Sequence, residues 1–234
     1  MNIVITGGSK GMGKALATKF AIAENSVFIC ARDENDLSNA AVEIQKENSY
    51  AQVQYFATDI SSKPSAIEFA GWLEEQNIIP DILINNAGQF KPGSIYNESD
   101  GLLEQMIAAN LYGAYHITRA LLPSMMKKKS GHIFNMCSIA SLSAYNNGGS
   151  YSISKYALMG FSKNLREELK PYNIKVTTVY PGAVYTASWE GSGIGPERIM
   201  EVNDITEMIY AASLLSPQAC VEDIIIRPLQ GDLP

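Results

Sequence analysis

Short runs of consecutive apolar residues alternate along the whole chain with longer stretches that mix apolar and polar residues. The apolar runs predict buried strands at about 3–5, 27–31, 53–57, 82–86, 132–136, 175–180 and 224–226. The mixed stretches predict helices at about 14–23, 37–48, 66–76, 103–128, 151–170 and 204–215, with a break near the start of the 103–128 helix. Strands that are apolar throughout, rather than at every second position, are typical of a parallel sheet covered on both faces.

The regular alternation of strand and helix predicts an α/β fold, a doubly wound, Rossmann-like parallel sheet in three layers. No repeat, low-complexity tract or long linker divides the sequence, so we expect a single domain over residues 1–234. The loosest segment, 183–196, contains small-residue breaks at Gly191, Ser192, Gly193 and Gly195. We expect a short substrate loop over about 183–203.

Composition narrows the range of functions. Hydrophobic residues make up 46% of the chain and charged residues 18%, so the chain can bury a core and is not disordered. The 18 Lys and Arg against 24 Asp and Glu give a formal net charge of −6, which argues against a nucleic-acid partner. Cys30, Cys137 and Cys220 are too scattered for a disulfide framework or a zinc cluster, and we expect no metal site.

The sequence also bears on the compartment. It starts without the basic residues and long apolar stretch of a signal peptide, and it has no run of 18 apolar residues. We therefore expect no membrane partner and a cytoplasmic location.

A glycine-rich turn follows the first predicted strand and leads into a helix, with the sequence Thr6-Gly7-Gly8-Ser9-Lys10-Gly11-Met12-Gly13. Glycines at such a turn let the backbone approach a diphosphate closely, and the helix N-terminus supplies free N–H groups. The alternative is an ordinary glycine-rich connection, but the order strand, turn, helix favours a dinucleotide site.

The glycines at 7, 11 and 13 form a TGxxxGxG pattern, and here the sequence resembles the short-chain dehydrogenase/reductase family in its ordinary-length subtype. Other motifs match the family in order and spacing between residues 6 and 186. They are Asn85-Asn86-Ala87-Gly88 (NNAG), a helical Asn110, Ser138 after the fifth strand, Tyr151-Ser152-Ile153-Ser154-Lys155 (YxxxK) and Pro181-Gly182.

The resemblance implies a catalytic group of Asn110, Ser138, Tyr151 and Lys155. Tyr151 and Lys155 are four residues apart on a predicted helix and so share a face, where the ammonium group stabilises a phenolate. In the family, the serine holds the substrate oxygen beside the tyrosine, and the asparagine holds a water that links the lysine to solvent.

The residue at the end of the second strand bears on the choice between NAD and NADP. An acid there would bind the adenosine ribose hydroxyls and repel a 2′-phosphate, but this chain has Ala31 followed by Arg32. Arg32 and Lys10 together fit a 2′-phosphate, which favours NADP(H) over NAD(H). The alternative is that both are surface charges, with Asp33 paired to Arg32.

The turn and the resemblance together assign cofactor contacts to a larger set of residues. Within it, Asp59 is expected at the adenine, with a simple turn role as the alternative, and Thr186 is either a cofactor contact or an ordinary loop hydroxyl. The set is Gly7, Ser9, Lys10, Gly11, Met12, Gly13, Arg32, Asp59, Ile60, Asn86, Ala87, Gly88, Tyr151, Lys155, Pro181, Gly182, Val184 and Thr186.

The substrate pocket is only outlined by position. Ser141 and Ser143 are alternatives to Ser138 as the hydroxyl that orients substrate. The other candidates are Gln89, Phe90, Leu142, Tyr145, Tyr185 and Trp189. Because the chain is short for the family after the sixth strand, we expect an open, lightly covered pocket.

The expected activity is that of an NADP(H)-dependent oxidoreductase, a carbonyl reductase that converts a small-molecule carbonyl to an alcohol or the reverse. A 3-oxoacyl-thioester or a small, pterin-like carbonyl are both compatible substrates. The alternatives are a non-enzymatic NADP-sensing protein and a sugar-nucleotide epimerase or dehydratase of the family's extended branch. The resemblance further implies a homodimer or homotetramer built through the helices at about 103–128 and 151–170.

Overall fold

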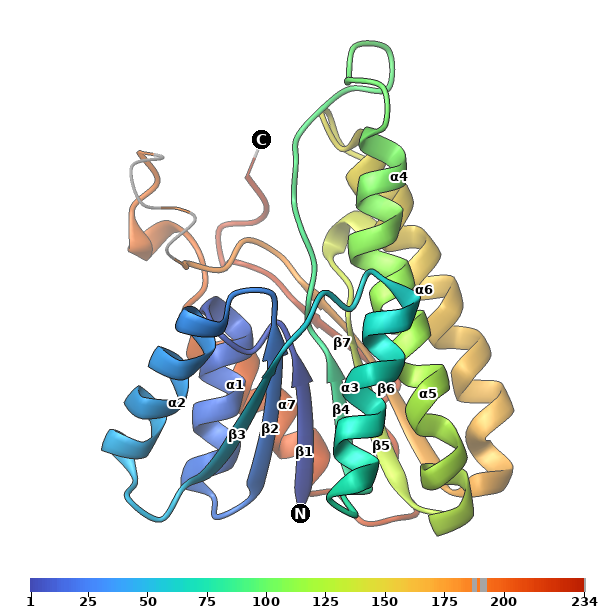
Figure 1. Cartoon of the computed structure of the whole chain (residues 1–234). Coiled ribbons are helices and arrows are strands. Elements are labelled where there is room, and N and C mark those ends of the chain that lie inside the picture. Colours follow the sequence, from blue (N-terminus) through green and yellow to red (C-terminus); the bar gives the residue numbers. More distant parts are fainter. Residues whose placement is uncertain (187–188, 190–192, 234) are drawn as a thin grey trace.

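In the computed structural model, which describes residues 1–186, 189 and 193–233, seven parallel strands form one sheet in the order β3-β2-β1-β4-β5-β6-β7 (Figure 1). Two of the loop residues singled out above, Gly191 and Ser192, lie outside the described residues. The strands are β1 Asn2–Thr6, β2 Ser26–Ala31, β3 Gln52–Ala57, β4 Ile82–Asn85, β5 Gly131–Met136, β6 Ile174–Pro181 and β7 Asp223–Ile226. The expected doubly wound parallel sheet is confirmed.

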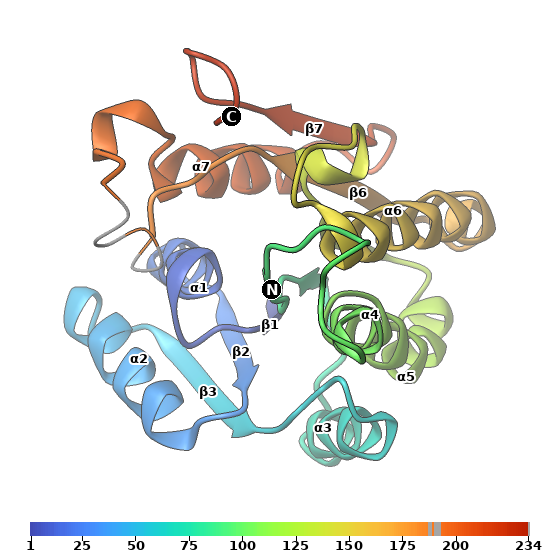
Figure 2. The same ribbon diagram turned by 90° about the horizontal axis from the view of Figure 1, so that it is seen from above.

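The helices cover the sheet in two layers, as Figure 2 shows from above. One layer holds α1 Gly11–Ile22, α2 Glu34–Glu47 and α7 Val202–Ser213. The other holds α3 Lys63–Glu75, α4 Leu102–Ile107, the π-helical turn η1 Ala108–Tyr112, α5 Gly113–Lys128 and α6 Gly149–Leu169. Short 3₁₀ turns complete the described chain at η2 Ile139–Ser141, η3 Lys170–Tyr172 and η5 Pro196–Arg198.

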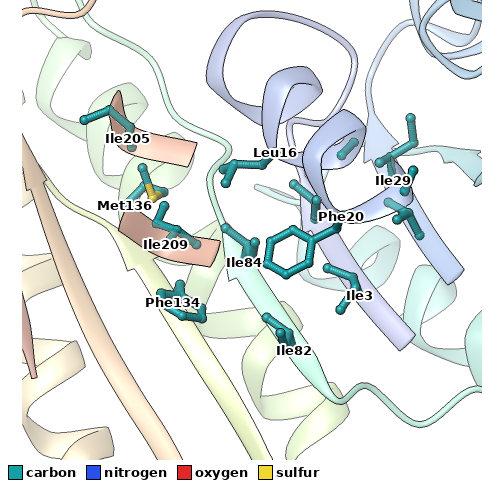
Figure 3. Packing of buried hydrophobic residues seen from close by; sticks show 14 of the residues in the cluster. Ile3, Leu16, Phe20, Ile29, Ile82, Ile84, Phe134, Met136, Ile205 and Ile209 are labelled. Carbon is teal, nitrogen blue, oxygen red and sulfur yellow. The ribbon is translucent and has the colours of Figure 1, made fainter. Parts of the chain in front are cut away.

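Successive side chains along a strand point to opposite faces of the sheet, and so toward different helix layers. Ile3 and Ile5 of β1 belong to the core beneath α1, α2 and α7, whereas Val4 belongs to the core beneath α3, α5 and α6. Figure 3 shows the first of these cores, in which Phe20 lies among aliphatic side chains. In β1, β2, β4, β5 and β6 both faces are buried, and this is why these strands are mostly apolar without alternation, whereas the edge strands β3 and β7 are partly exposed.

The chain order of the strands reverses at β1, which pairs with β2 on one side and with β4 on the other. In open α/β sheets, ligands bind in the crevice outside the carboxyl ends of the strands at such a reversal. The fold therefore places the turn after β1 and the segment after β4 side by side at one edge.

In the described part of the chain, no helix has both the length and the apolar character needed to cross a bilayer. Within the same residues, no group of three or more His, Cys, Asp or Glu side chains is placed to hold a metal ion.

Candidate active site

The turn between β1 and α1 depends on its glycines. Gly7 and Gly11 have φ values of +66° and +53°. Residues with a Cβ rarely adopt this backbone conformation. A Cβ at Gly13 would lie 2.1 Å from the Gly7 carbonyl oxygen, and one at Gly7 would lie 2.9 Å from the Cα of Ala87. The glycines thus bring α1 and the segment after β4 against the turn.

Asn86 braces this turn from the neighbouring strand. Its Nδ2 donates to the carbonyl oxygens of Thr6 and Gly7 at 3.0 and 3.1 Å. The buried Thr6 hydroxyl in turn accepts hydrogen bonds from the backbone N–H groups of Asn86 and Ala87, each at 3.1 Å. The side chain of Asn86 therefore fixes the shape of the crevice.

A cavity of about 580 Å³ opens between the turn and the ends of β2, β3 and β4. Most of the predicted cofactor residues line it: Gly7, Ser9, Lys10, Gly11, Met12, Arg32, Asp59, Ile60, Asn86, Ala87, Gly88 and Thr186. The structure adds residues that the sequence analysis did not assign to the cofactor, namely Cys30, Ala31, Asp33, Asp36, Thr58, Ser61, Gln89 and Ala109. Thr58 and Ser61 flank Asp59, so their position after the third strand is the signal that could have identified them.

The two predicted phosphate-binding cations differ in their surroundings. Lys10 Nζ lies 2.6 Å from Asp36 Oδ2, and this contact raises the pKa of Lys10. Arg32 is exposed and forms no ion pair with any residue that the structure describes. The alternative pairing of Arg32 with Asp33 is wrong, because Asp33 Oδ1 accepts the backbone N–H of Asp36 at 2.9 Å and caps α2.

Asp59 forms the local turn that was one of the two roles considered for it, and it also lies at the cavity. Its Oδ1 accepts from the backbone N–H and the hydroxyl of Ser61 at 3.0 and 2.7 Å, which is a local turn. The same residue lines the cavity. Ile60 beside it is buried, and its Cδ1 lies 3.0 Å from the position that a Cβ on Gly113 would occupy.

Tyr151 and Lys155 lie one turn apart near the start of α6. Lys155 is 6% exposed, and its Nζ donates to the carbonyl oxygen of Met136 at 2.7 Å and lies 5.8 Å from the centre of the Tyr151 ring. Met136 is the last residue of β5 and precedes Ser138 by two positions. This hydrogen bond therefore holds the start of α6 against the segment that carries Ser138.

Ser138 is the better placed of the three candidate serines. Its Oγ accepts from the backbone N–H of Ala140 at 3.2 Å, so the hydroxyl hydrogen can be donated to another oxygen. Ser141 is fully buried, and its Oγ accepts the backbone N–H of Ser138 at 3.3 Å. Ser143 is exposed, beyond η2.

Asn110 lies on the π-helical turn and is 1% exposed. Its Oδ1 accepts from the backbone N–H of Gln89 at 2.7 Å, and its Nδ2 donates to Gln89 O and Ser154 Oγ at 3.0 and 2.8 Å. A Cβ on Gly88 would lie 2.9 Å from Asn110 Oδ1 and 3.5 Å from Lys155 Nζ. The amide of Asn110 thus joins the segment after β4 to α6 beside the lysine.

Two aromatic side chains, Phe90 and Tyr145, lie near Tyr151. Phe90 meets it edge to face, with 4.9 Å between the ring centres and 86° between the planes. Burial, and then the proximity of Tyr151, raise the pKa of Tyr145 to about 12, so its hydroxyl stays protonated and can act as a neutral hydrogen-bond donor. Leu142, which precedes Tyr145 in the sequence, is exposed.

The remaining predicted residues do not line the cavity. Pro181 ends β6, and the backbone N–H of Gly182 donates to Ile226 O at 2.8 Å. Val184 is buried and pairs with Met200 in an isolated bridge. Among the loop residues, Thr186 alone of the predicted set reaches the cavity, where its methyl carbon lies 3.6 Å from the position of a Cβ on Gly11.

Comparison with known proteins agrees with this arrangement. A family model described as short chain dehydrogenase matches residues 1–194. Sepiapterin reductase of Chlorobaculum tepidum is 30% identical over 239 residues, covering 99% of this chain and 97% of that protein.

Two solved structures have the same fold over nearly the whole chain. An alcohol dehydrogenase from the archaeon Thermococcus sibiricus, complexed with 5-hydroxy-NADP, superposes with a TM-score of 0.90 at 26% identity, covering 100% of this chain and 98% of that one. A metagenomic short-chain oxidoreductase in complex with NADP superposes with a TM-score of 0.84 at 29% identity, covering 97% and 96% of the two chains. The family model over residues 1–194 and these relatives of nearly equal length show that the chain belongs to the short chain dehydrogenase family of oxidoreductases.

Proposed function

We propose that the protein is an NADP(H)-dependent oxidoreductase that interconverts a carbonyl group and an alcohol on a small molecule. The observation that carries the proposal is the hydrogen bond from Lys155 to Met136 O, which joins the Tyr151–Lys155 turn of α6 to the segment that bears Ser138. This assembly lies at the carboxyl edge of the sheet, where the glycine-lined cavity also opens.

The residues present fit a nicotinamide dinucleotide. Gly7, Ser9 and Gly11 of the turn line the cavity in front of the first turn of α1, where backbone N–H groups can meet a diphosphate, and Arg32 offers a guanidinium group at the end of β2. Two relatives of similar fold carry NADP or its 5-hydroxy derivative, which supports NADP(H) as the cofactor here. When bound, the nicotinamide supplies the hydride for carbonyl reduction and takes it up in the reverse reaction.

The side chains supply the proton and the orientation. Ser138 Oγ donates a hydrogen bond to the substrate oxygen, and Tyr151 Oη gives that oxygen its proton during reduction. The ammonium of Lys155 stabilises the phenolate that remains. Asn110 acts through its hydrogen bonds to Gln89 and Ser154, which fix the wall beside Lys155.

We further propose that the segment 183–203 is the substrate loop of this single domain. Its two ends are joined by backbone hydrogen bonds, from Tyr185 N to Met200 O at 2.8 Å and from Met200 N to Ala183 O at 3.1 Å. These bonds anchor the base of the loop beside the end of β6.

The proposed chemistry is tested with Tyr151→Phe. The variant removes the proton donor and keeps the ring that packs on Phe90, so NADPH binding should remain while turnover falls by at least about 10²-fold. Loss of NADPH absorbance is followed with a panel of carbonyl compounds that includes sepiapterin and a 3-oxoacyl thioester. Tyr156→Phe, on the exposed side of the same helix, is the matched control.

Unchanged turnover in the Tyr151→Phe variant would refute the proposed proton transfer. A wild-type protein that binds NADPH tightly, yet oxidises it with no compound of a broad panel, would instead favour a cofactor-sensing protein.

A further inference from the structure

We propose that Asp36 competes with the 2′-phosphate of NADP(H) for the ammonium group of Lys10, and so weakens the preference of this enzyme for NADP(H) over NAD(H). The inference rests on the proposed function, because it assumes that this cavity holds the adenosine half of the cofactor. It concerns a carboxylate that neither the glycine motif nor the end of β2 contains.

The three charged groups lie around one opening. Lys10 is the residue before α1, Asp36 lies in the first turn of α2, and Arg32 follows β2; all three line the same cavity. The ion pair between Lys10 Nζ and Asp36 Oδ2, 2.6 Å apart, spans the gap between the two helices. Lys10 therefore meets an incoming phosphate already bound to a carboxylate.

Asp36 is the acid in direct contact with Lys10. Asp33 adds a weaker electrostatic attraction to Lys10, but its own Oδ1 caps α2 by accepting the Asp36 N–H. The Asp36 side chain is 33% exposed and that of Lys10 is 72% exposed, so the pair lies at the rim where solvent and ligand both reach it. The two side chains can therefore separate when a phosphate group, which carries more negative charge than a carboxylate, binds beside them.

The two cofactors differ in what they present to this pair. A 2′-phosphate carries close to two negative charges and is repelled by a carboxylate that already holds the nearest ammonium. Lys10 must either leave Asp36, exposing an unpaired carboxylate to the phosphate, or be shared between the two anions. The ribose 2′-hydroxyl of NAD(H) has no charge and can donate a hydrogen bond to a carboxylate, so Asp36 opposes only one of the two cofactors.

The test uses fragments without the nicotinamide, so that no turnover is needed. Binding of 2′,5′-ADP and of 5′-AMP is measured by titration calorimetry at low salt, for the wild type, Asp36→Asn and the control Glu34→Gln. Glu34 lies in the same first turn of α2 and forms no ion pair with a described residue, so this control removes one charge from α2 without freeing Lys10. Urea unfolding of each variant confirms that the fold is retained.

We expect Asp36→Asn to tighten 2′,5′-ADP binding by about tenfold, equivalent to ~1.4 kcal/mol, with less than about a twofold change for 5′-AMP. The Glu34→Gln variant should change either affinity by less than about threefold. In a Lys10→Met background, the gain from Asp36→Asn should fall by at least half, because the contested ammonium is gone.

Three results would overturn the proposal: no gain beyond that of the control, weaker binding in Asp36→Asn, or a full gain that persists without Lys10. A full gain without Lys10 would mean that Asp36 weakens binding only by direct repulsion of the negatively charged phosphate. A failure of the proposed NADP(H) function would give a different result. The wild type would then bind 2′,5′-ADP no more tightly than 5′-AMP, and Arg32→Ala would change the affinity for neither nucleotide.

Discussion

The same added methyl group has opposite consequences at two glycines of this chain. A Cβ at Gly13 would lie 2.1 Å from the Gly7 carbonyl oxygen and 2.5 Å from Asn86 Nδ2, whereas one at Gly71 in the middle of α3 would meet no heavy atom within 4 Å. We expect Gly13→Ala to lower the free energy of unfolding by at least about 1–3 kcal/mol and to abolish cofactor binding.

The matched variant is Gly71→Ala, which should raise the free energy of unfolding by about 0.5–1 kcal/mol because alanine favours a helix. Urea denaturation measures both values, and a neutral Gly13→Ala would show that the turn has room for a side chain.

Arg32 carries a second prediction at this scale. Its guanidinium group is unpaired among the described residues and lies at the cavity, so Arg32→Ala should weaken NADPH binding by about tenfold or more and leave NADH within about twofold. Fluorescence titration of the two reduced cofactors measures the difference. Equal losses for both cofactors would remove the argument for a 2′-phosphate site.

Single residues also mark where sequence reasoning reaches its limit. Gly7, Gly11 and Gly13 were recognisable because a strand, a turn and a helix occur in unbroken succession around them. The pairing of Lys10 with Asp36 was not, because it depends on how α1 and α2 lie across two strands. Asn86 was expected to contact the cofactor, and the structure shows that its amide also holds the turn through Thr6 and Gly7.

At the scale of elements, the segment between β4 and α4 is tied to the start of α6. The Glu98 carboxylate accepts the backbone N–H of Ser150 at 3.1 Å and also its hydroxyl, and Gly93 N donates to Asn147 O at 3.0 Å. A second cavity, of about 680 Å³, opens beside these residues. The first turn of α6, which contains Tyr151, is therefore capped by a distant part of the chain.

We expect Glu98→Ala to cost about 1 kcal/mol in the free energy of unfolding, because a free helix N–H loses its acceptor. The backbone amides of residues 93–100 should also exchange with solvent faster. Hydrogen exchange measured by mass spectrometry tests this, with Glu104→Ala on the exposed side of α4 as the control. Unaltered exchange over residues 93–100 would mean that other contacts hold the segment.

The elements themselves were largely predictable, and their irregularities were not. The break expected near the start of the 103–128 helix is a π-helical turn, Ala108–Tyr112, which turns Asn110 toward Gln89 and Ser154. Apolar periodicity can indicate that a helix is interrupted, but the type of turn depends on buried hydrogen bonds that come from other segments.

At the scale of the whole molecule, α4, η1, α5 and α6 carry large hydrophobic side chains that remain exposed. Figure 1 shows these helices together on one side of the sheet. The exposed side chains are Leu103, Tyr112, Tyr115, Ile153 and Tyr156. We expect a homodimer or homotetramer that covers them, and we expect Tyr112→Glu combined with Ile153→Glu to shift it toward monomers. Sedimentation velocity at micromolar concentration tests both, and a wild type that sediments only as a monomer would contradict the prediction.

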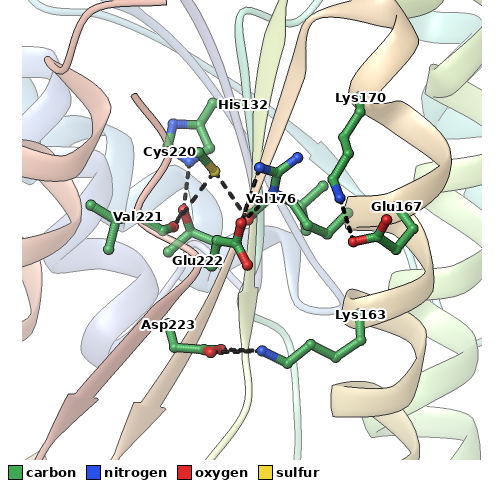
Figure 4. A network of polar contacts seen from close by, with 11 residues as sticks. His132, Lys163, Glu167, Lys170, Val176, Cys220, Val221, Glu222 and Asp223 are labelled. Atoms are coloured by element: carbon green, nitrogen blue, oxygen red, sulfur yellow. Dashed lines mark hydrogen bonds and ion pairs between the residues drawn. The ribbon is translucent and has the colours of Figure 1, made fainter. Parts of the chain in front are cut away.

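A buried histidine makes the stability of the whole fold depend on pH. His132 is 4% exposed, its Nε2 lies 2.7 Å from Thr177 Oγ1, and Nδ1 has no partner among the described residues. Figure 4 shows it beside the Cys220–Val221 segment. Thr177 donates to Val221 O, so the histidine donates through Nε2. Burial, and then the charge of Lys175, lower the pKa of His132 to about 3.

In the unfolded chain, His132 binds a proton below about pH 6.5. In the folded chain it does so only near pH 3, so protonation below pH 6.5 favours the unfolded state. We expect this residue to cost about 2 kcal/mol of folding free energy between pH 7 and pH 5. Urea unfolding at both values measures the loss. In His132→Gln, which keeps a side-chain amide for Thr177, the loss over this range should be smaller by that amount.

The strand order is the part of the architecture that the sequence left open. Apolar runs identified the strands but not which strands lie next to one another. The neighbours in the sheet come from segments far apart in the chain, as the pairs Ile3↔Ile82 and Ile84↔Phe134 show. Pairings of that kind follow from packing both helix layers at once, which no local pattern records.

The central position of β1 has a consequence during synthesis. One of its edges is covered by β4, which leaves the ribosome about 4–16 s after β1 at ordinary elongation rates. For that interval the nascent chain carries an apolar strand with an open edge, a template for pairing with other chains. A holdase chaperone that binds extended apolar segments should therefore cross-link to ribosome-bound chains that stop before Ile82 and release those that extend well beyond Asn85.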